Sequence, residues 1–397
     1  MVLQHPGIDI ASRRMPVTGY AIDSSRVNSG SAEQLRGTSA KECSDSGFLW
    51  KKYMSMNLLL GIFGVILVLL VAVDVLQTTL LLRGSGPFTS RLNNMLWKVA
   101  LSAHRVRPAH RLLGYVGLLI IIFTIFLWIS LIWVGWVCIF ATEPTAVLSA
   151  QDNQPASLSD RVYFVGYTLI TLGLGDYKAG GPIWQVATVI ASTNGFFLVT
   201  LIITYLLPIV SAVVHQRQLA TYITGLGTSP AQILTCAWNG QDFSALSQHL
   251  MALTPDVLKL GQQHLAYPVL HYYHSREHYS AIAPKIATLD EALTVLEYGL
   301  EPAQQLDAIE VRPLRMAITH FLNTLETAFI TPDSDTPPLP DLLRVRDQDI
   351  QTVSADVFQH RTTHLTRRRQ LLLALVKRDG WNWEDVRAMV APREDMR

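Results

Sequence analysis

The sequence predicts an all-α integral membrane protein with a helical domain at its C-terminal end, on the basis of three observations. Of the 397 residues, 49% are hydrophobic and only 16% are charged. The hydrophobic residues gather in three long blocks between Met54 and Val214. The polar sequence after these blocks repeats apolar residues every three or four positions, which is the period of a helix. Together these features are typical of a membrane module joined to a water-soluble tail.

Each hydrophobic block is long enough to cross a bilayer, which takes about 20 apolar residues. We expect the first membrane helix over residues 54–83, and the other two blocks run from Leu112 to Ala141 and from Ile183 to Val214. The first block begins too deep in the chain, and is too long, for a cleaved signal peptide. Residues 1–53 are rich in Ser, Gly and Arg, so we expect them to be disordered.

The segment 84–111 fixes the predicted topology. It carries several Arg and Lys residues and no Asp or Glu, so the positive-inside rule places it in the cytoplasm or at the inner interface. The chain then crosses outward, returns, and leaves residues 216–397 in the cytoplasm. We therefore predict a multi-pass protein of the cell's inner membrane. Lys51 and Lys52 argue against the external N-terminus that this topology requires.

The tail, residues 216–397, is predicted to be a helical domain. Apolar residues, mostly leucines, recur at helical spacing at Leu246-Leu250-Leu253, Leu289-Leu293-Leu296-Leu300, Leu314-Ile318-Leu322-Leu325 and Leu371-Leu375. Pro337, Pro338 and Pro340 indicate a turn or linker within it.

The motif that carries chemistry lies between the second and third blocks. It reads Thr171-Leu172-Gly173-Leu174-Gly175-Asp176. A dehydrated cation needs oxygen ligands in place of its water shell, and an extended chain can supply backbone carbonyls. Glycine tolerates the positive φ that such a ribbon needs. We expect the leucine side chains to point away from the ion path, the Thr171 hydroxyl to add a ligand, and Asp176 to cap the outer end.

The sequence before the motif fits this interpretation. Ser157 or Ser159 can cap a short helix over Arg161 to Ile170, which would turn its negative C-terminal end toward the ion path. Irregular backbone at membrane depth is tolerated only where it is buried in protein or lines a water-filled path. The motif therefore predicts a selectivity filter rather than an ordinary glycine-rich turn.

From about Leu112 to Val214 the chain resembles the two-transmembrane, pore-loop potassium channel superfamily. Residues 171–176 are similar to its TVGYGD signature, and Gly195 corresponds to its inner-helix hinge glycine. With its extra first helix and helical tail, the whole chain resembles an uncharacterised bacterial branch. The resemblance implies a homotetramer, because one filter strand cannot surround an ion. It also implies passive conduction of K⁺. The sequence shows no nucleophile–base pair, phosphate loop or zinc-protease signature, so we expect no enzyme activity and no cofactor.

One residue departs from the family pattern: Leu174 stands where a tyrosine usually braces the filter through its hydroxyl. Potassium selectivity stays the favoured interpretation. The alternatives are a weakly selective monovalent cation channel and, from another class, a non-conducting membrane sensor or scaffold.

The third block offers candidate gating residues. Gly195 can act as a hinge or can allow close helix packing, and Pro208 is a second bend point. An apolar constriction near the inner end can gate by losing water. The candidate cavity and gate residues are Phe196, Val199, Ile203, Thr204 and Leu207.

His271, His274 and His278 are a weak metal-site candidate if a helix follows Pro268, and Asp74 is an acid inside a membrane span. The arginines at 367–369 favour a solvated helix face over a lipid contact. The net charge of +1 argues against nucleic-acid binding, and three scattered cysteines form no disulfide framework. The expected partners are the lipid bilayer, further copies of this chain and an unknown regulatory ligand of the C-terminal domain.

Overall fold

The computed structural model describes residues 29–81, 85–106 and 110–387. The chain divides into two units, residues 1–59 and residues 60–397, and each is described by itself. In the first unit, α1 (Ser29–Leu80) is already helical from Ser29 onward. The prediction of disorder for residues 1–53 is therefore wrong for 29–53, while residues 1–28 lie outside the described part. The Ser- and Gly-rich segment 29–53 is helical because extending an existing helix avoids the cost of nucleation. In addition, residues 32–36 are Ala-Glu-Gln-Leu-Arg, which are strong helix formers.

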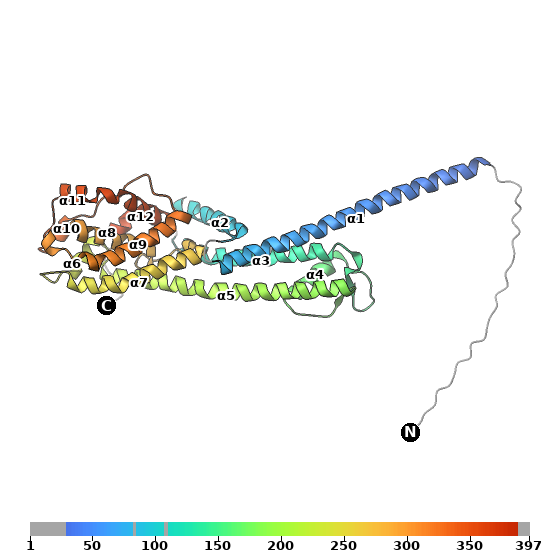
Figure 1. Ribbon diagram of the computed structural model, residues 1–397, viewed down its shortest axis with the longest axis horizontal. Coiled ribbons are helices and arrows are strands. Elements are labelled where there is room, and N and C mark those ends of the chain that lie inside the picture. The colour runs from blue at the N-terminus through green and yellow to red at the C-terminus, as the bar shows by residue number, and fades with distance from the viewer. Residues whose placement is uncertain (1–28, 82–84, 107–109, 388–397) are drawn as a thin grey trace, which may run out of the picture. The chain divides into compact units, whose positions relative to one another are not determined.

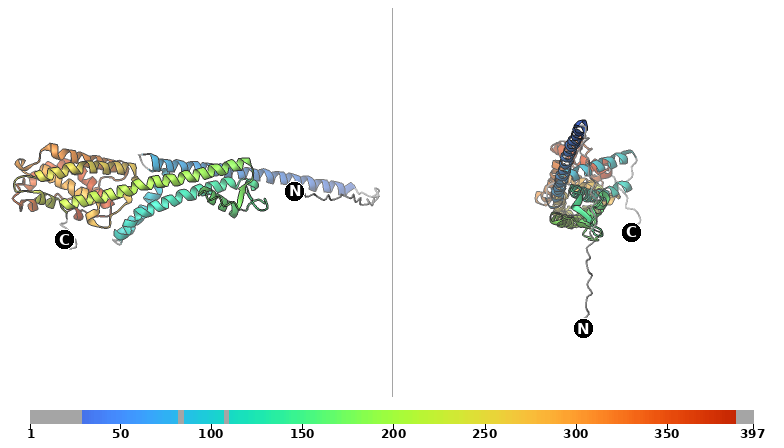
Figure 2. Two further views of the ribbon diagram at one scale, coloured as in Figure 1. Left: turned by 90° about the horizontal axis from the view of Figure 1, so that it is seen from below. Right: turned by 90° about the vertical axis from the view of Figure 1, so that its right-hand side faces the viewer.

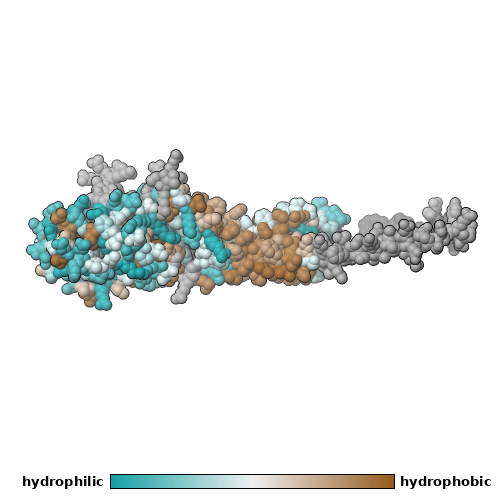
Figure 3. All heavy atoms as spheres, turned by 90° about the horizontal axis from the view of Figure 1, so that it is seen from above, coloured by the Kyte–Doolittle hydropathy of each residue, from teal (hydrophilic) through white to brown (hydrophobic). Residues whose placement is uncertain are grey.

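Among the described residues, three helices are long and apolar enough to cross a membrane. They are the Ser55–Leu80 part of α1, α3 (His110–Phe140) and α5 (Pro182–Leu226). This confirms the predicted fold class. Gly64 of α1 packs on Gly135 of α3, so the two helices approach closely. Figure 3 shows the apolar side chains gathered in one band over these helices, whereas the C-terminal helices present a mainly hydrophilic face.

The basic segment forms α2 (Pro87–Val106), which doubles back along α3. Thr124 of α3 donates a hydrogen bond to Asn93 of α2 over 3.1 Å, and Trp97 of α2 is buried. The predicted interfacial helix is thus packed against protein along much of its length (Figure 1). Residues 82–84 and 107–109 of the predicted segment lie outside the described residues.

Asp74 holds the start of α2. Its Oδ1 accepts hydrogen bonds from the backbone N–H groups of Phe88 (2.8 Å) and Thr89 (3.4 Å). Its Oδ2 accepts from the Thr89 hydroxyl (2.6 Å) and from the Trp128 indole (2.9 Å). A carboxylate at a helix N-terminus is stabilised by the positive end of the helix dipole. The buried acid therefore has a structural role, and its partners lie on α2 and α3 rather than among the neighbouring residues of α1.

Between α3 and α5 the chain forms a compact cap. It contains η1 (Pro144–Ala146), β1 (Val147–Ser149), α4 (Leu158–Leu169) and β2 (Tyr177–Ala179). The two strands pair antiparallel, with Val147 opposite Ala179 and Ser149 opposite Tyr177. This pairing joins the segment before α4 to the segment after the glycine-rich motif, so both sides of the motif are fixed to one another.

The C-terminal domain is helical, as predicted. Its elements are α6 (Pro230–Ala237), α7 (Ser244–Ala266), η2 (Pro268–Tyr272), η3 (His278–Ser280), α8 (Ile282–Tyr298), η4 (Pro302–Gln304), α9 (Ala308–Ala328), α10 (Leu343–Arg346), α11 (Ala355–Thr362), η5 (Thr363–Leu365), α12 (Thr366–Arg378) and α13 (Trp383–Arg387). Helices α7 and α9 pack along each other, and α8 is buried along nearly its whole length. Pro337, Pro338 and Pro340 lie in the loop between α9 and α10.

Two buried acids of α8 bind the arginines of α12. Asp290 accepts a hydrogen bond from Arg368 Nε at 2.9 Å, and Glu291 accepts one from Arg369 Nε at 2.7 Å. A further arginine, Arg315 of α9, also pairs with Asp290 at 2.9 Å. Arg368 and Arg369 are thus largely buried inside the domain, so neither the lipid contact nor the solvated face describes them.

The helix α5 runs unbroken from the membrane part into the C-terminal domain, as Figure 2 shows. Leu219 and Ile223 near its end are buried in the core of that domain. The boundary predicted between residues 215 and 216 therefore lies inside a continuous helix. Movement of the domain and movement of the membrane helix are mechanically joined at this point.

Replacing Asp74 with Ala is expected to lower the free energy of unfolding by about 3 kcal/mol, because it leaves the first N–H groups of α2 and the Thr89 hydroxyl without their acceptor and the Trp128 indole with the Thr89 hydroxyl alone. Thermal unfolding of the purified protein in detergent measures the change. Thr79→Ala is the matched control, since among the described residues the Thr79 hydroxyl bonds only the Val75 carbonyl of its own helix. Equal unfolding temperatures for the two variants would contradict the assigned role.

Candidate functional site

The site is built from the end of α4. Ser157 caps this helix: its hydroxyl accepts a hydrogen bond from the backbone N–H of Asp160, and the Asp160 carboxylate accepts one from the N–H of Ser157. This capping box confirms Ser157 as the cap. The helix begins at Leu158, earlier than the predicted Arg161, and ends at Leu169 with Ile170 as its C-cap. Its negative end is therefore directed at the residues that follow.

The motif segment, residues 171–176, has an alternating backbone. Thr171 (φ +59°), Gly173 (φ +58°) and Gly175 (φ +86°) are left-handed, and the leucines between them are not. An alternation of this kind turns successive N–H groups to one side of the chain and the carbonyls to the other. The coordination of a dehydrated cation requires a row of carbonyl oxygens on one side of a chain, and a backbone of this kind is compatible with it.

Thr171 is strained in this arrangement. Its side chain is β-branched, and such residues rarely adopt positive φ, at a cost of about 1–3 kcal/mol. The strain is held by two hydrogen bonds onto the end of α4. The N–H of Thr171 donates to Thr168 O (3.1 Å), and the N–H of Leu172 donates to Tyr167 O (2.9 Å). At the other end of the segment, Asp176 O accepts from the N–H of Ala150 (2.9 Å).

Two tyrosines of α4 brace the far end of the motif segment. The hydroxyl of Tyr163 donates to Asp176 Oδ2 at 3.1 Å, and the hydroxyl of Tyr167 donates to Tyr177 O at 2.8 Å. Their rings meet edge to face, with centroids 5.2 Å apart. Leu174 has no hydroxyl with which to brace the motif segment. The Tyr163 and Tyr167 hydroxyls of α4 brace it instead. This brace was not predicted from the sequence, although two tyrosines four residues apart lie on one helical face.

The motif segment is uncovered in the single chain. Leu172 is 59% exposed and Leu174 is 51% exposed, and no atom lies near the positions where a Cβ would stand on Gly173 or Gly175. The candidate cavity residues of α5 are exposed as well: Phe196, Val199, Ile203, Thr204 and Leu207. The predicted filter, cavity and gate-lining residues thus share one property: the rest of the chain does not cover them.

Gly195 lies against the C-terminal end of α4. A Cβ added there would stand 2.7 Å from the carbonyl carbon of Leu169 and closer still to its oxygen. Of the two roles weighed for Gly195, close packing is therefore the one seen here. The helix around it is continuous, and Pro208 also lies within α5 without ending it. The hinge roles of Gly195 and Pro208 remain predictions.

The histidine cluster proposed as a metal site is not formed. Pro268 begins only the short η2, and a loop separates it from η3, so His271, His274 and His278 do not share a helical face. Each has a different neighbour: His264, Asp379 and the backbone oxygen of Asp385, respectively. No three metal-ligating side chains converge anywhere in residues 29–81, 85–106 and 110–387.

Comparisons with known proteins identify the family. A family model described as "Ion channel" matches residues 115–212, which includes α4, the motif segment and most of α5. The "Uncharacterized membrane protein YdjJ" of Bacillus subtilis is 36% identical over 324 residues, which is 81% of this chain and 94% of that protein. The chain belongs to the two-transmembrane, pore-loop ion channel family. Because the similarity to YdjJ is much longer than the channel module, it extends beyond the pore region. No solved structure matches the chain.

The Gly195 contact gives a prediction that separates packing from hinge motion. Gly195→Ala is expected to lower the free energy of unfolding by about 3 kcal/mol, since its Cβ meets backbone that cannot move aside. Gly225→Ala in the same helix meets open space and is expected to gain about 0.5–1 kcal/mol from the lost freedom of glycine. Thermal unfolding in detergent compares the two. If Gly195→Ala is as stable as the parent and differs from it only in ion flux, Gly195 acts as a hinge instead.

Proposed function

We propose that this channel conducts K⁺ selectively, as a homotetramer, through the backbone carbonyls of Thr171, Leu172, Gly173 and Leu174. The observation that carries the proposal is the alternating backbone of residues 171–176, with left-handed Thr171, Gly173 and Gly175. This conformation aligns oxygens in consecutive layers, and each layer can replace part of the hydration shell of an ion. The Thr171 hydroxyl would add a further layer at the inner end.

Selectivity requires oxygens that hold their positions. The hydrogen bonds from the N–H groups of Thr171 and Leu172 onto α4 fix the inner end, and Tyr163 and Ala150 hold Asp176 at the outer end. The C-terminal dipole of α4 adds negative potential at the inner end of the segment. These contacts support potassium selectivity even though Leu174 has no hydroxyl. A weakly selective cation channel is the second candidate, favoured by that same residue.

The tetramer follows from what the single chain leaves open. One strand offers oxygens on one side only, so several copies must surround the ion. The exposed leucines of the motif segment and the exposed apolar stripe of α5 are the surfaces that neighbouring copies would cover or that would line the shared path. Four copies around a four-fold axis close the ring.

The orientation is inferred from charge. The α2 segment carries Arg91 and Lys98 on its described part and no acidic residue, which suits the cytoplasmic side. The end of α1 beside α2 and the C-terminal domain would then face the cytoplasm. The motif cap, with acids Glu143, Asp152 and Asp160, would face outward from the cell's inner membrane.

The test is a reversal potential. The purified protein is reconstituted in liposomes with opposed K⁺ and Na⁺ gradients, beside Gly173→Asp and the control Gly240→Asp. Both glycines have positive φ and open space, but Gly240 lies in a loop of the C-terminal domain. We expect a reversal near the potassium value for the parent and for Gly240→Asp, and loss of that current in Gly173→Asp.

The other results decide between the remaining candidates. A reversal near zero would show a weakly selective channel. Currents that are indifferent to Gly173→Asp would place the conduction path elsewhere. Absence of flux under K⁺, Na⁺ and applied voltage alike would favour the sensor or scaffold.

A further inference from the structure

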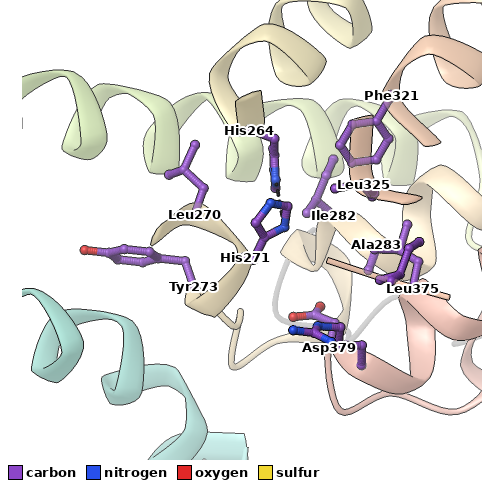
Figure 4. A pocket seen from close by; sticks show the side chains of 12 residues that line it. His264, Leu270, His271, Tyr273, Ile282, Ala283, Phe321, Leu325, Leu375 and Asp379 are labelled. Carbon is purple, nitrogen blue, oxygen red and sulfur yellow. Dashed lines mark hydrogen bonds between the residues drawn. The ribbon is translucent and has the colours of Figure 1, made fainter. Parts of the chain in front are cut away.

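Three polar side chains link α5 to a cavity inside the C-terminal domain. The amide nitrogen of Gln216, on α5, lies 2.6 Å from Nε2 of His264, on α7. Nδ1 of His264 lies 3.2 Å from Nδ1 of His271, on η2. Figure 4 shows the two imidazoles meeting between the helices, with His271 at the centre of the cavity. The other nitrogen of His271, Nε2, is buried and has no hydrogen-bond partner.

The chain of contacts determines which atoms carry protons. Burial lowers the pKa of His264 to about 3 and lowers the pKa of His271 well below its usual range, so each ring is neutral and has one N–H. The amide N–H of Gln216 donates to His264 Nε2, which leaves the proton of His264 on Nδ1. That proton is donated to His271 Nδ1, so the proton of His271 lies on Nε2. The cavity therefore receives an N–H donor that lacks an acceptor.

A second donor lines the same cavity. The Nε of Arg378, at the end of α12, is buried and has no hydrogen-bond partner. Nowhere in residues 29–81, 85–106 and 110–387 does an acid form an ion pair with Arg378. The Arg378 side chain as a whole is half-buried, and this burial lowers its pKa. Buried cations normally have a negatively charged partner.

The acid that lines the cavity is engaged elsewhere. Asp379 also lines the cavity, but its Oδ1 lies 3.6 Å from Nδ1 of His274. Burial raises the pKa of Asp379, which weakens it further as a counter-ion. The remaining lining is mostly apolar and is contributed by Leu270, Ile282, Ala283, Phe321, Leu325, Ile330 and Leu375. The two unpartnered donors are thus the groups that recognise a ligand.

The cavity sets the size of that ligand. It has a volume of about 40 Å³ for the centres of water-sized groups. One such group needs about 10–15 Å³ by the same measure, so the cavity accepts roughly three of them. This is enough for the oxygens of a small oxyanion and too little for a nucleoside.

We propose that this cavity is a binding site for a small inorganic oxyanion, which accepts hydrogen bonds from His271 Nε2–H and from the Arg378 guanidinium. The bound oxyanion supplies the acceptor and the counter-charge that these two donors lack. It also fixes the protonation of His271, and through His264 it strengthens the contact of α7 with Gln216. His264, which lines the cavity, contacts Gln216 of α5. On the proposed function, α5 is the helix that lines the ion path.

The test measures binding, so its outcome does not depend on whether the channel conducts. The full-length protein in detergent is titrated with inorganic phosphate by calorimetry and by thermal unfolding, at fixed pH and ionic strength, with chloride as the balancing anion. We expect millimolar phosphate to raise the unfolding temperature of the parent protein by mass action. Arg378→Gln is expected to weaken phosphate binding about tenfold or more, because a charged hydrogen bond is lost.

Two further variants control the result. His271→Phe removes the Nε2–H donor but keeps a ring for the stack on Phe329, whose centroid is 3.6 Å away, so it should also weaken binding. Arg361→Gln removes an exposed arginine of α11 and should bind phosphate like the parent. AMP should not stabilise the protein, since its nucleoside does not fit. The proposal would be overturned if phosphate did not stabilise the parent protein, or if it stabilised Arg378→Gln and His271→Phe as much as the parent. It would also be overturned if AMP raised the unfolding temperature of the parent as much as phosphate does.

Discussion

The structure depends on how the two ends of the motif segment are held. An alternating backbone has no hydrogen bonds of its own to stabilise it, and Thr171 adds strain at its first residue. The bonds from Thr171 and Leu172 to the end of α4, and from Ala150 to Asp176, supply the missing restraint. The capping box of α4, the two strands and the tyrosine brace all serve this restraint. Without it the backbone of residues 171–176 would have no fixed conformation.

The second constraint is that one helix, α5, contacts both the base of α4 and the C-terminal domain. Gly195 of α5 touches the base of α4, while Gln216, Leu219 and Ile223 of the same helix belong to the C-terminal domain. The aromatic residues Tyr272 and Tyr273 add a second connection, because Tyr272 donates a hydrogen bond to Asn94 of α2 and Tyr273 lies against Gly117 of α3. A change within the domain therefore reaches the membrane helices through two separate contacts. These contacts connect the domain physically to the membrane helices.

The parts that could be predicted from sequence are those set by local rules. The three spans follow from hydropathy, the Ser157 cap follows from its spacing to Asp160, and the backbone of the motif follows from its glycines. The start of α1 could not be predicted, because composition alone does not show that a helix will be extended from an apolar span. Neither could the histidine neighbours, since a proline after α7 starts only one short turn there and the partners come from other helices.

Contacts between distant segments were also beyond the sequence. Asp74 is 54 positions from Trp128, and nothing near it indicates that it caps α2. Tyr163 and Asp176 are separated by 13 positions, with the strained segment between them. Arg368 and Asp290 are 78 positions apart, so the sequence alone suggests that Arg368 is exposed to solvent. In each case the partner is fixed by packing, which a hydrophobic pattern does not specify.

The central claim is that the carbonyls of residues 171–174 bind permeating ions along a shared axis. Crystals of the protein grown with Rb⁺ and measured at the rubidium absorption edge test it directly, because only the ion contributes the anomalous signal. We expect a row of rubidium peaks on a four-fold axis, each within coordination distance of carbonyl oxygens from Thr171 to Leu174. An assembly without that axis, or rubidium peaks only away from residues 171–176, would contradict it.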